Sequence, residues 1–179
     1  MSSFANIYGA SLFSLADDES LTDVIMEQLS EIDVILKDNP DYTLLLNSPT
    51  IPVEKRIGFV DEAFSSMHEY VLNFIKLLCE KKCIHVFSEC VKNYRKFYND
   101  KHNIETVTAI TAVPLSDELR AKLCKKLEKE SGKKIVLDEK VDNSILGGII
   151  LRTQNSQTDA SVRARLNAIR EKITCEQID

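Results

Sequence analysis

The sequence predicts an α+β protein in which an N-terminal antiparallel helical bundle is followed by a small α/β domain. Apolar residues recur at helical spacing from the N-terminus to about residue 101. From residue 106 onward, alternating segments rich in β-branched residues appear between amphipathic ones. The formal net charge also changes, from −7 over residues 1–105 to +2 over residues 106–179, which together make the −5 of the whole chain. We therefore expect two domains, a helical bundle at 1–105 and an α/β domain at 106–179.

The first 101 residues contain one amphipathic helix after another. The stripes of apolar residues predict helices at about 4–16, 21–36, 57–64, 71–79 and 84–99. Asn39-Pro40 ends the second helix, because proline lacks a backbone donor and restricts the residue before it. The breaks between the stripes are short, as they are between antiparallel neighbours in a helical bundle.

The remaining residues predict the order strand, helix, strand, strand, helix. Thr106 to Val113 alternates and is rich in β-branched residues, so it predicts a strand. Ser116 can cap the following helix at its N-terminus, and Gly132 stands where a C-terminal cap belongs. Lys134 to Leu137 predicts a second strand. A right-handed crossover joins the two strands, and we expect a hairpin to lead from the second strand to the third.

Two adjacent glycines interrupt the third strand, which we expect at Ile145 to Thr153. Gly147 and Gly148 stand in a run of Ile and Leu, where glycine usually marks a bulge or the close approach of another backbone. A polar turn follows at 153–158. Asp159 can then cap the last helix, with Ser161 in the cap or the first turn.

The composition excludes several classes of protein. No apolar run approaches the roughly 20 residues of a membrane helix, so we expect no direct insertion into a membrane. The acidic first part argues against binding to nucleic acid or anionic lipid. Asp17, Asp18 and Glu19 argue against a transit peptide. The five cysteines are irregularly spaced, as in cytosolic proteins with reduced thiols.

No motif for catalysis, cofactor binding or metal binding is present. The chain has only five glycines, and the Gly147-Gly148 pair is not followed by the Lys-Ser or Lys-Thr of a phosphate-binding loop. Ser161 lacks the glycines of a nucleophile elbow. Cysteines and one histidine cluster at Cys79, Cys83, His85 and Cys90, but their spacing fits no common zinc pattern. We therefore expect no catalytic, cofactor or metal site.

The C-terminal motif resembles that of a known family. The residues that carry it are Leu146, Gly147, Gly148, Asp159, Ser161, Val162 and Arg163, in the order glycine pair, polar turn, Asp-x-Ser-Val-Arg and helix. This order resembles the C-terminal signature of the F-type ATP synthase delta subunit, the counterpart of the mitochondrial oligomycin-sensitivity-conferring protein. Further similar segments lie along nearly the whole chain, at Tyr8–Ala16, Leu46–Arg56, Asn73–Leu78, Pro114–Ser116 and Ser131–Lys133.

Two positions depart from the family pattern. The family often has Gly-Arg where Lys82-Cys83 stands, and Asp-Gly-Ser where Asp159-Ala160-Ser161 stands. The second departure bears on the conformation of the turn, because alanine avoids the positive φ that glycine allows.

The resemblance also implies partners. In the family, the first and fifth of six N-terminal helices bind the N-terminal helical segment of the catalytic head's α subunit. Carried over, this implies a groove between the helix at 4–16 and the helix at about 84–99, with candidates Ile7, Tyr8, Ser11, Phe87, Val91 and Tyr94. The residues alone leave open whether each faces a groove or the core, and the helical stripe by itself favours the core for Tyr8 and Phe87. The family's C-terminal domain meets the C-terminal helices of the b subunits, and Leu146 to Arg165 would contribute here.

The resemblance implies a non-catalytic stator subunit that links the catalytic head to the peripheral stalk during proton-driven ATP synthesis. Such a subunit lies at the cytoplasmic face of the cell membrane and is held there by the rest of the complex. The alternative is a free helical adaptor protein that binds amphipathic helices of another complex. An enzyme is the third interpretation.

Overall fold

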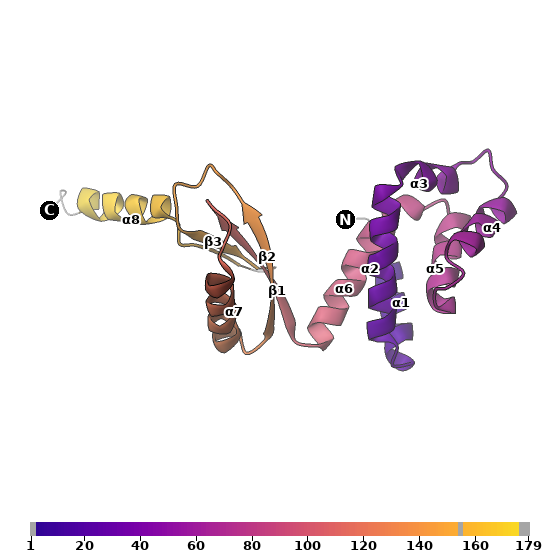
Figure 1. The fold of residues 1–179 in the computed structure, drawn as a ribbon, viewed down its shortest axis with the longest axis horizontal. Coiled ribbons are helices and arrows are strands. Elements are labelled where there is room, and N and C mark those ends of the chain that lie inside the picture. The colour runs from indigo at the N-terminus through magenta and orange to yellow at the C-terminus, as the bar shows by residue number, and fades with distance from the viewer. Residues whose placement is uncertain (1–2, 154–155, 176–179) are drawn as a thin grey trace. The chain divides into compact units, whose positions relative to one another are not determined.

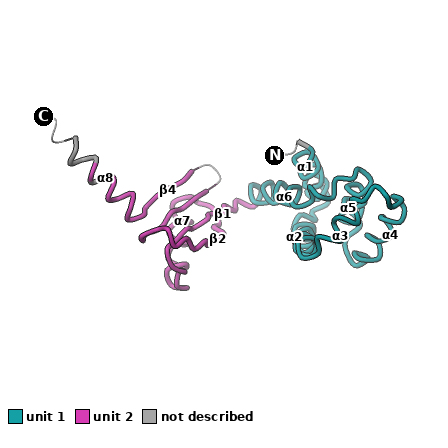
Figure 2. The backbone as a smooth tube through the Cα atoms, turned by 90° about the horizontal axis from the view of Figure 1, so that it is seen from above, with its two compact units in different colours: residues 1–101 teal, residues 102–179 magenta. Residues whose placement is uncertain are grey.

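A computed structural model describes residues 3–153 and 156–175, and the chain divides into two compact units, residues 1–101 and 102–179 (Figure 2). Both classes of secondary structure lie where the sequence predicts them, so the predicted α+β class is confirmed. Independent folding of residues 1–105 and 106–179 stays a prediction.

Unit 1 is helical throughout its described part (Figure 1). Its elements are α1 (Ser3–Asp18), α2 (Thr22–Asp38), α3 (Pro40–Asn47), α4 (Val53–Ala63), α5 (Glu69–Glu80), the short 3₁₀ helix η1 (Ile84–Val86) and α6 (Phe87–Lys101). Helix α2 ends before Asn39-Pro40, as predicted, and Pro40 opens α3. The short α3 is not among the helices predicted from the sequence, and it makes the helix at 69–80 the fifth of the unit.

Helix α6 packs most extensively against α1 and also against α2. Gly9 makes the contact with α1 close, because a Cβ atom there would lie 2.9 Å from both the Asn93 Cβ and the Cys90 carbonyl oxygen. Tyr94 is fully buried, and its hydroxyl donates to the Thr22 carbonyl at 3.1 Å. Burial raises the pKa of the Tyr94 phenol.

A buried arginine joins three shorter helices. Arg56 of α4 is 1% exposed, and its Nη1 donates to the Leu46 carbonyl of α3 and the Cys79 carbonyl of α5, both at 2.8 Å. Both acceptors lie in the last turn of their helix, where carbonyl groups lack intrahelical partners. The cation also faces the negative ends of two helix dipoles, which favours its charge.

Unit 2 contains a four-stranded mixed sheet in its described part. Its elements are β1 (Ile104–Thr111), α7 (Asp117–Ser131), β2 (Lys134–Val141), β3 (Ile149–Arg152), β4 (Gln157–Asp159) and α8 (Val162–Cys175). The strand order is β2-β1-β3-β4, with β2 parallel to β1 and the other pairs antiparallel. Helix α7 connects β1 to β2 and packs on the sheet, and the predicted caps are present, since Ser116 accepts from the Leu119 amide and Gly132 has φ +69°.

The strand pairing corrects one prediction. No hairpin joins β2 to β3 in the sheet; β3 pairs instead with the opposite edge of β1, with Thr111 opposite Ile149. The hairpin is β3–β4, and β4 lies where the sequence predicted the end of a polar turn and the cap of the last helix. The third strand also begins late, at Ile149, because Gly147 and Gly148 have φ +154° and +87°. Such values interrupt the extended backbone that a regular strand needs.

Candidate functional site

Helices α1 and α5 form a groove of about 390 Å³ on unit 1. Its lining consists of aromatic and aliphatic side chains with two small polar ones between them, namely Tyr8, Ser11, Leu12 and Leu15 from α1 and Tyr70, Asn73, Phe74 and Leu77 from α5. Leu12 and Phe74 are each 6% exposed and so form the floor of the groove. No charged side chain lines it. We refer to it as the α1/α5 groove.

Helix α1 has two apolar sides. The other helices of the unit cover one of them, and the second stays exposed. Ala5, Leu12 and Ala16 are buried in the core. Phe4, Ile7 and Leu15, in contrast, are 54%, 61% and 42% exposed. Together with Tyr8 they form a second stripe at helical spacing that runs along the α1/α5 groove. An exposed apolar stripe of this kind marks an interaction surface more often than isolated exposed residues do.

Helix α5 has the same two-sided character. Val71, Ile75 and Leu78 are fully buried in the core. Tyr70, Asn73 and Leu77 lie on the neighbouring side, which lines the groove. These three residues were not among the candidates predicted from the sequence. A signal for them was present, because α5 has apolar residues beside its core stripe, and packing in the core requires only one apolar stripe on a helix.

The three α6 candidates do not line the α1/α5 groove. Phe87, Val91 and Tyr94 are 1%, 2% and 0% exposed, because α6 is packed against α1 and α2, and Phe87 lines a different recess, described below. Of the six interface candidates, Tyr8 and Ser11 line the α1/α5 groove, and Ile7 lies beside it on the exposed stripe of α1. The groove therefore borders the helix at 69–80 and not the helix at about 84–99.

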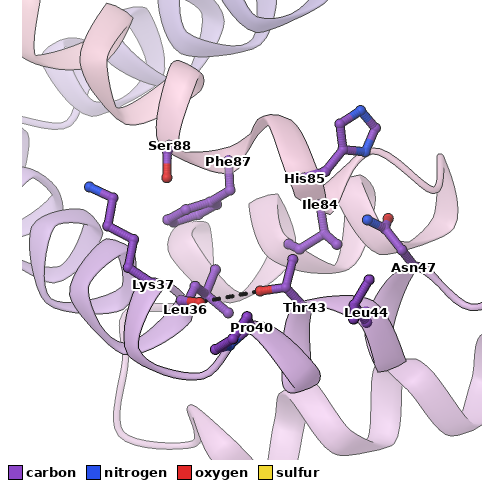
Figure 3. A pocket seen from close by; sticks show the side chains of 10 residues that line it. All are labelled: Leu36, Lys37, Pro40, Thr43, Leu44, Asn47, Ile84, His85, Phe87 and Ser88. Carbon is purple, nitrogen blue, oxygen red and sulfur yellow. Dashed lines mark hydrogen bonds between the residues drawn. The ribbon is translucent and has the colours of Figure 1, made fainter.

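A second apolar recess, of about 380 Å³, lies between α2, α3 and the start of α6 (Figure 3). Leu36, Pro40, Ile84 and Phe87 contribute its apolar walls, and the Thr43 hydroxyl donates to the Leu36 carbonyl at 3.4 Å. Lys37 and His85 are its ionisable residues, and Lys37 is paired with Asp33 at 2.5 Å. This recess and the α1/α5 groove share no lining residue and are separate features of the unit.

Two cysteines of unit 1, Cys79 and Cys90, are buried. Burial raises the pKa of Cys79 and of Cys90 to about 11, so both are protonated thiols at neutral pH. No group of three or more His, Cys, Asp or Glu side chains among the described residues could hold a metal ion.

In unit 2, the backbone of the glycine pair lies against the turn that precedes α8. A Cβ atom on Gly148 would lie 2.6 Å from the Ala160 carbonyl oxygen and 2.8 Å from the Ser161 Cα. Backbone hydrogen bonds hold the two segments together, from the Ala160 amide to the Ile149 carbonyl and from the Val162 amide to the Gly147 carbonyl, each at 3.0 Å. The predicted close approach of another backbone is therefore confirmed at Gly148.

The cap of α8 is Ser161 and not Asp159. The Ser161 hydroxyl oxygen accepts from the Ala164 amide at 3.2 Å, three residues into the helix, which is the N-cap geometry. Asp159 lies two residues before the cap, at the end of β4, and its Oδ1 accepts from the Ser161 amide at 2.9 Å. These hydrogen bonds to Ser161 lower the pKa of the Asp159 carboxyl group. The two residues thus fix the angle at which the chain enters α8.

Exposed aliphatic side chains gather where β1 and β2 end. Val141 is paired with Thr111 at the last position of both strands, Val113 follows two residues later, and Leu146 lies in the connection to β3. Val162 follows the Ser161 cap and is bonded to Gly147 through its amide. Leu146 is 77% exposed, and the other three are exposed as well. We call Val113, Val141, Leu146 and Val162 the apolar end of unit 2; Arg163, also exposed, follows it in α8.

Within residues 3–153 and 156–175, no helix is both long enough and apolar enough to cross a membrane.

Comparison with known proteins gives consistent results. Residues 4–173 match the family model described as the ATP synthase delta (OSCP) subunit. The ATP synthase subunit delta of Clostridioides difficile (strain 630) is 31% identical over 172 residues, which cover 95% of each chain. That of Lactobacillus gasseri is 31% identical over 170 residues, which cover 94% of this chain and 93% of the relative. A chain in the structure of the Toxoplasma gondii mitochondrial ATP synthase hexamer has the same fold, with a TM-score of 0.75 at 18% identity, over 97% of this chain and 98% of that one.

Proposed function

Since the chain belongs to the ATP synthase delta (OSCP) subunit family, we propose that it is a non-catalytic stator subunit that links the catalytic head of an F-type ATP synthase to the peripheral stalk. Rotation of the central shaft applies torque to the head, and the stator holds the head still so that this torque drives proton-coupled ATP synthesis. The subunit itself handles neither nucleotide nor proton. It belongs to the periphery of the complex, at the cytoplasmic face of the cell membrane.

The observation that carries the contact with the head is the α1/α5 groove. The N-terminal helix of the α subunit would lie in it, in the recurring mode of an amphipathic helix in an apolar groove. The exposed stripe from Phe4 to Leu15 extends over about 17 Å of helix axis, which is enough for about three turns of a docked helix. Burial of this stripe removes from water apolar surface that unit 1 leaves uncovered on α1.

The contact with the stalk belongs to unit 2. We assign the C-terminal helices of the b subunits to the apolar end, because its four aliphatic side chains are exposed and leave apolar surface that a partner helix can cover. Leu146 and Val162 belong to the signature region that implied this contact at the level of sequence. Separate surfaces on separate units allow one chain to hold the head and the stalk at the same time.

A charge placed in the α1/α5 groove tests the contact with the head. Ser11 lines the groove and is exposed, so Ser11→Arg should leave the fold intact but force a guanidinium group under the docked helix. Because burying an unpaired charge is costly, the affinity for a peptide that copies the N-terminus of the organism's α subunit should fall at least tenfold. Isothermal titration calorimetry on the full chain measures this affinity.

Ser14→Arg is the matched control, because Ser14 is an exposed serine of the same helix that does not line the groove. It should bind the peptide like the unmodified chain. Equal affinity of the Ser11→Arg variant and the unmodified chain would show that the α-subunit segment binds elsewhere. Circular dichroism of both variants checks that the helices are retained.

A further inference from the structure

The α1/α5 groove is not uniformly apolar, because a polar residue lies at the middle of each wall. On α1, Ser11 lies between Tyr8 and Leu15, three and four residues away. On α5, Asn73 lies between Tyr70 and Leu77, again three and four residues away. The two walls therefore have the same order of apolar, polar and apolar side chains, with the polar residue between the two apolar ones on each helix.

These polar groups are available for a ligand. Ser11 and Asn73 are exposed, and within the described part of the chain neither side chain makes a hydrogen bond to another residue. Water satisfies them while the groove is open. A helix docked in the groove displaces that water, and an unsatisfied hydroxyl or carboxamide would then oppose binding.

We propose, on the basis of the docking function above, that Ser11 and Asn73 form a polar band that selects the partner helix and fixes its register. The helix that fits carries one side chain able to hydrogen-bond, such as Asn, Gln, Ser or a carboxylate, opposite the band. It carries apolar side chains three or four residues to either side, which pack against the tyrosine and leucine pairs. Asn73 is the main determinant, because its carboxamide has two N–H donors and a carbonyl acceptor, whereas the Ser11 hydroxyl has a single donor.

The physical reason is that a single polar position in an apolar interface costs affinity but rejects alternatives. A polar residue at one core position of a coiled coil sets register in this way. An apolar stripe alone would allow a docked helix to slide by one turn, since Tyr8, Leu15, Tyr70 and Leu77 accept many aliphatic partners. With the polar band, a slipped register leaves Asn73 facing an aliphatic side chain, and that register is disfavoured.

The test uses the full chain and a set of designed amphipathic peptides that share one apolar stripe. One peptide has leucine at every stripe position, and the others have a single asparagine that moves along the stripe. Binding is measured by fluorescence anisotropy. The unmodified chain should bind the peptide with a central asparagine about tenfold more tightly than the all-leucine peptide, because one buried hydrogen-bonded group is satisfied instead of stranded.

The double variant Ser11→Leu/Asn73→Leu should reverse this preference and bind the all-leucine peptide more tightly. Ser14→Leu is the control and should keep the preference of the unmodified chain, since Ser14 does not line the groove. The proposal of the polar band is overturned if the unmodified chain binds the all-leucine peptide as tightly as every asparagine peptide. That outcome is distinct from failure of the proposed function, which would be seen as absent binding of the α-subunit peptide, because the designed peptides compare registers without it.

Discussion

The glycine pair allows a quantitative test of the packing in unit 2, through Gly148→Ala. Alanine adds only a Cβ atom, but at this position the atom would lie 2.6 Å from one backbone atom and 2.8 Å from another. Neither neighbour is a flexible side chain, so backbone must move. The backbone of Gly148 also has a φ of +87°, a conformation that alanine disfavours. Two separate costs therefore act on the same substitution.

The two costs can be estimated separately. A left-handed backbone costs alanine about 1 kcal/mol relative to glycine. Overpacking against a fixed neighbour adds about 1–3 kcal/mol. We therefore expect Gly148→Ala to lower the free energy of unfolding of unit 2 by about 2–4 kcal/mol.

Two other glycines of the chain serve as controls. Gly132 has φ +69° but open space around its Cα, so Gly132→Ala should show the backbone cost alone, about 1 kcal/mol. Gly58 lies within α4 with open space and no positive φ, so Gly58→Ala should stabilise unit 1 by about 1 kcal/mol.

Native-state hydrogen exchange of the full chain, read by mass spectrometry on peptides from β1 and β3, reports the free energy of opening of unit 2. The decisive comparison is between Gly148→Ala and Gly132→Ala. If the two variants lose the same stability, the overlap with the Ala160–Ser161 turn does not exist and the close-approach argument is wrong.

Two further predictions concern unit 1. A fragment of residues 1–105 should fold alone, with a helical circular dichroism spectrum and a cooperative melt, because its core cluster contains residues of this unit only; a random-coil spectrum would contradict the domain boundary. Arg56→Met should cost about 3 kcal/mol in urea unfolding, because it leaves the buried Leu46 carbonyl at the end of α3 without a partner and removes one of the two hydrogen bonds to the Cys79 carbonyl at the end of α5. Exposed Lys55→Met should cost nearly nothing, and equal stability of the two variants would show that the Arg56 hydrogen bonds do not hold the helices together.

The parts of the fold that depend on local pattern were predictable. Helical spacing located α1, α2, α5 and α6, and the caps at Ser116 and Gly132 follow from local hydrogen bonding. The partner of β3 was not predictable in this way. Its apolar residues fit beside either β1 or β2, and each of these strands still has a free edge after the parallel pair has formed, so the local pattern does not decide between them.

Only the α1 wall of the candidate site was predicted from the sequence, for a related reason. Periodicity shows that a helix has an apolar stripe, but it does not show whether another helix covers that stripe. Tyr94 and Tyr8 belong to similar stripes, yet Tyr94 is fully buried while Tyr8 lines the α1/α5 groove. Only helix α5 carried additional information, since Tyr70 and Leu77 extend its apolar surface beyond what its core contacts with Val71 and Ile75 need.

The two departures from the family's glycines have different consequences in this structure. Lys82 has φ +55° and occupies the left-handed position of a Schellman motif at the end of α5, since the Cys83 amide donates to the Leu78 carbonyl and the Lys82 amide to the Cys79 carbonyl. Glycine suits that backbone, and lysine costs about 1 kcal/mol relative to it. Ala160, in contrast, has no positive φ. The strain in the signature region lies at Gly148, whose missing side chain leaves room for Ala160, so a methyl group is tolerated on one side of this contact and excluded on the other.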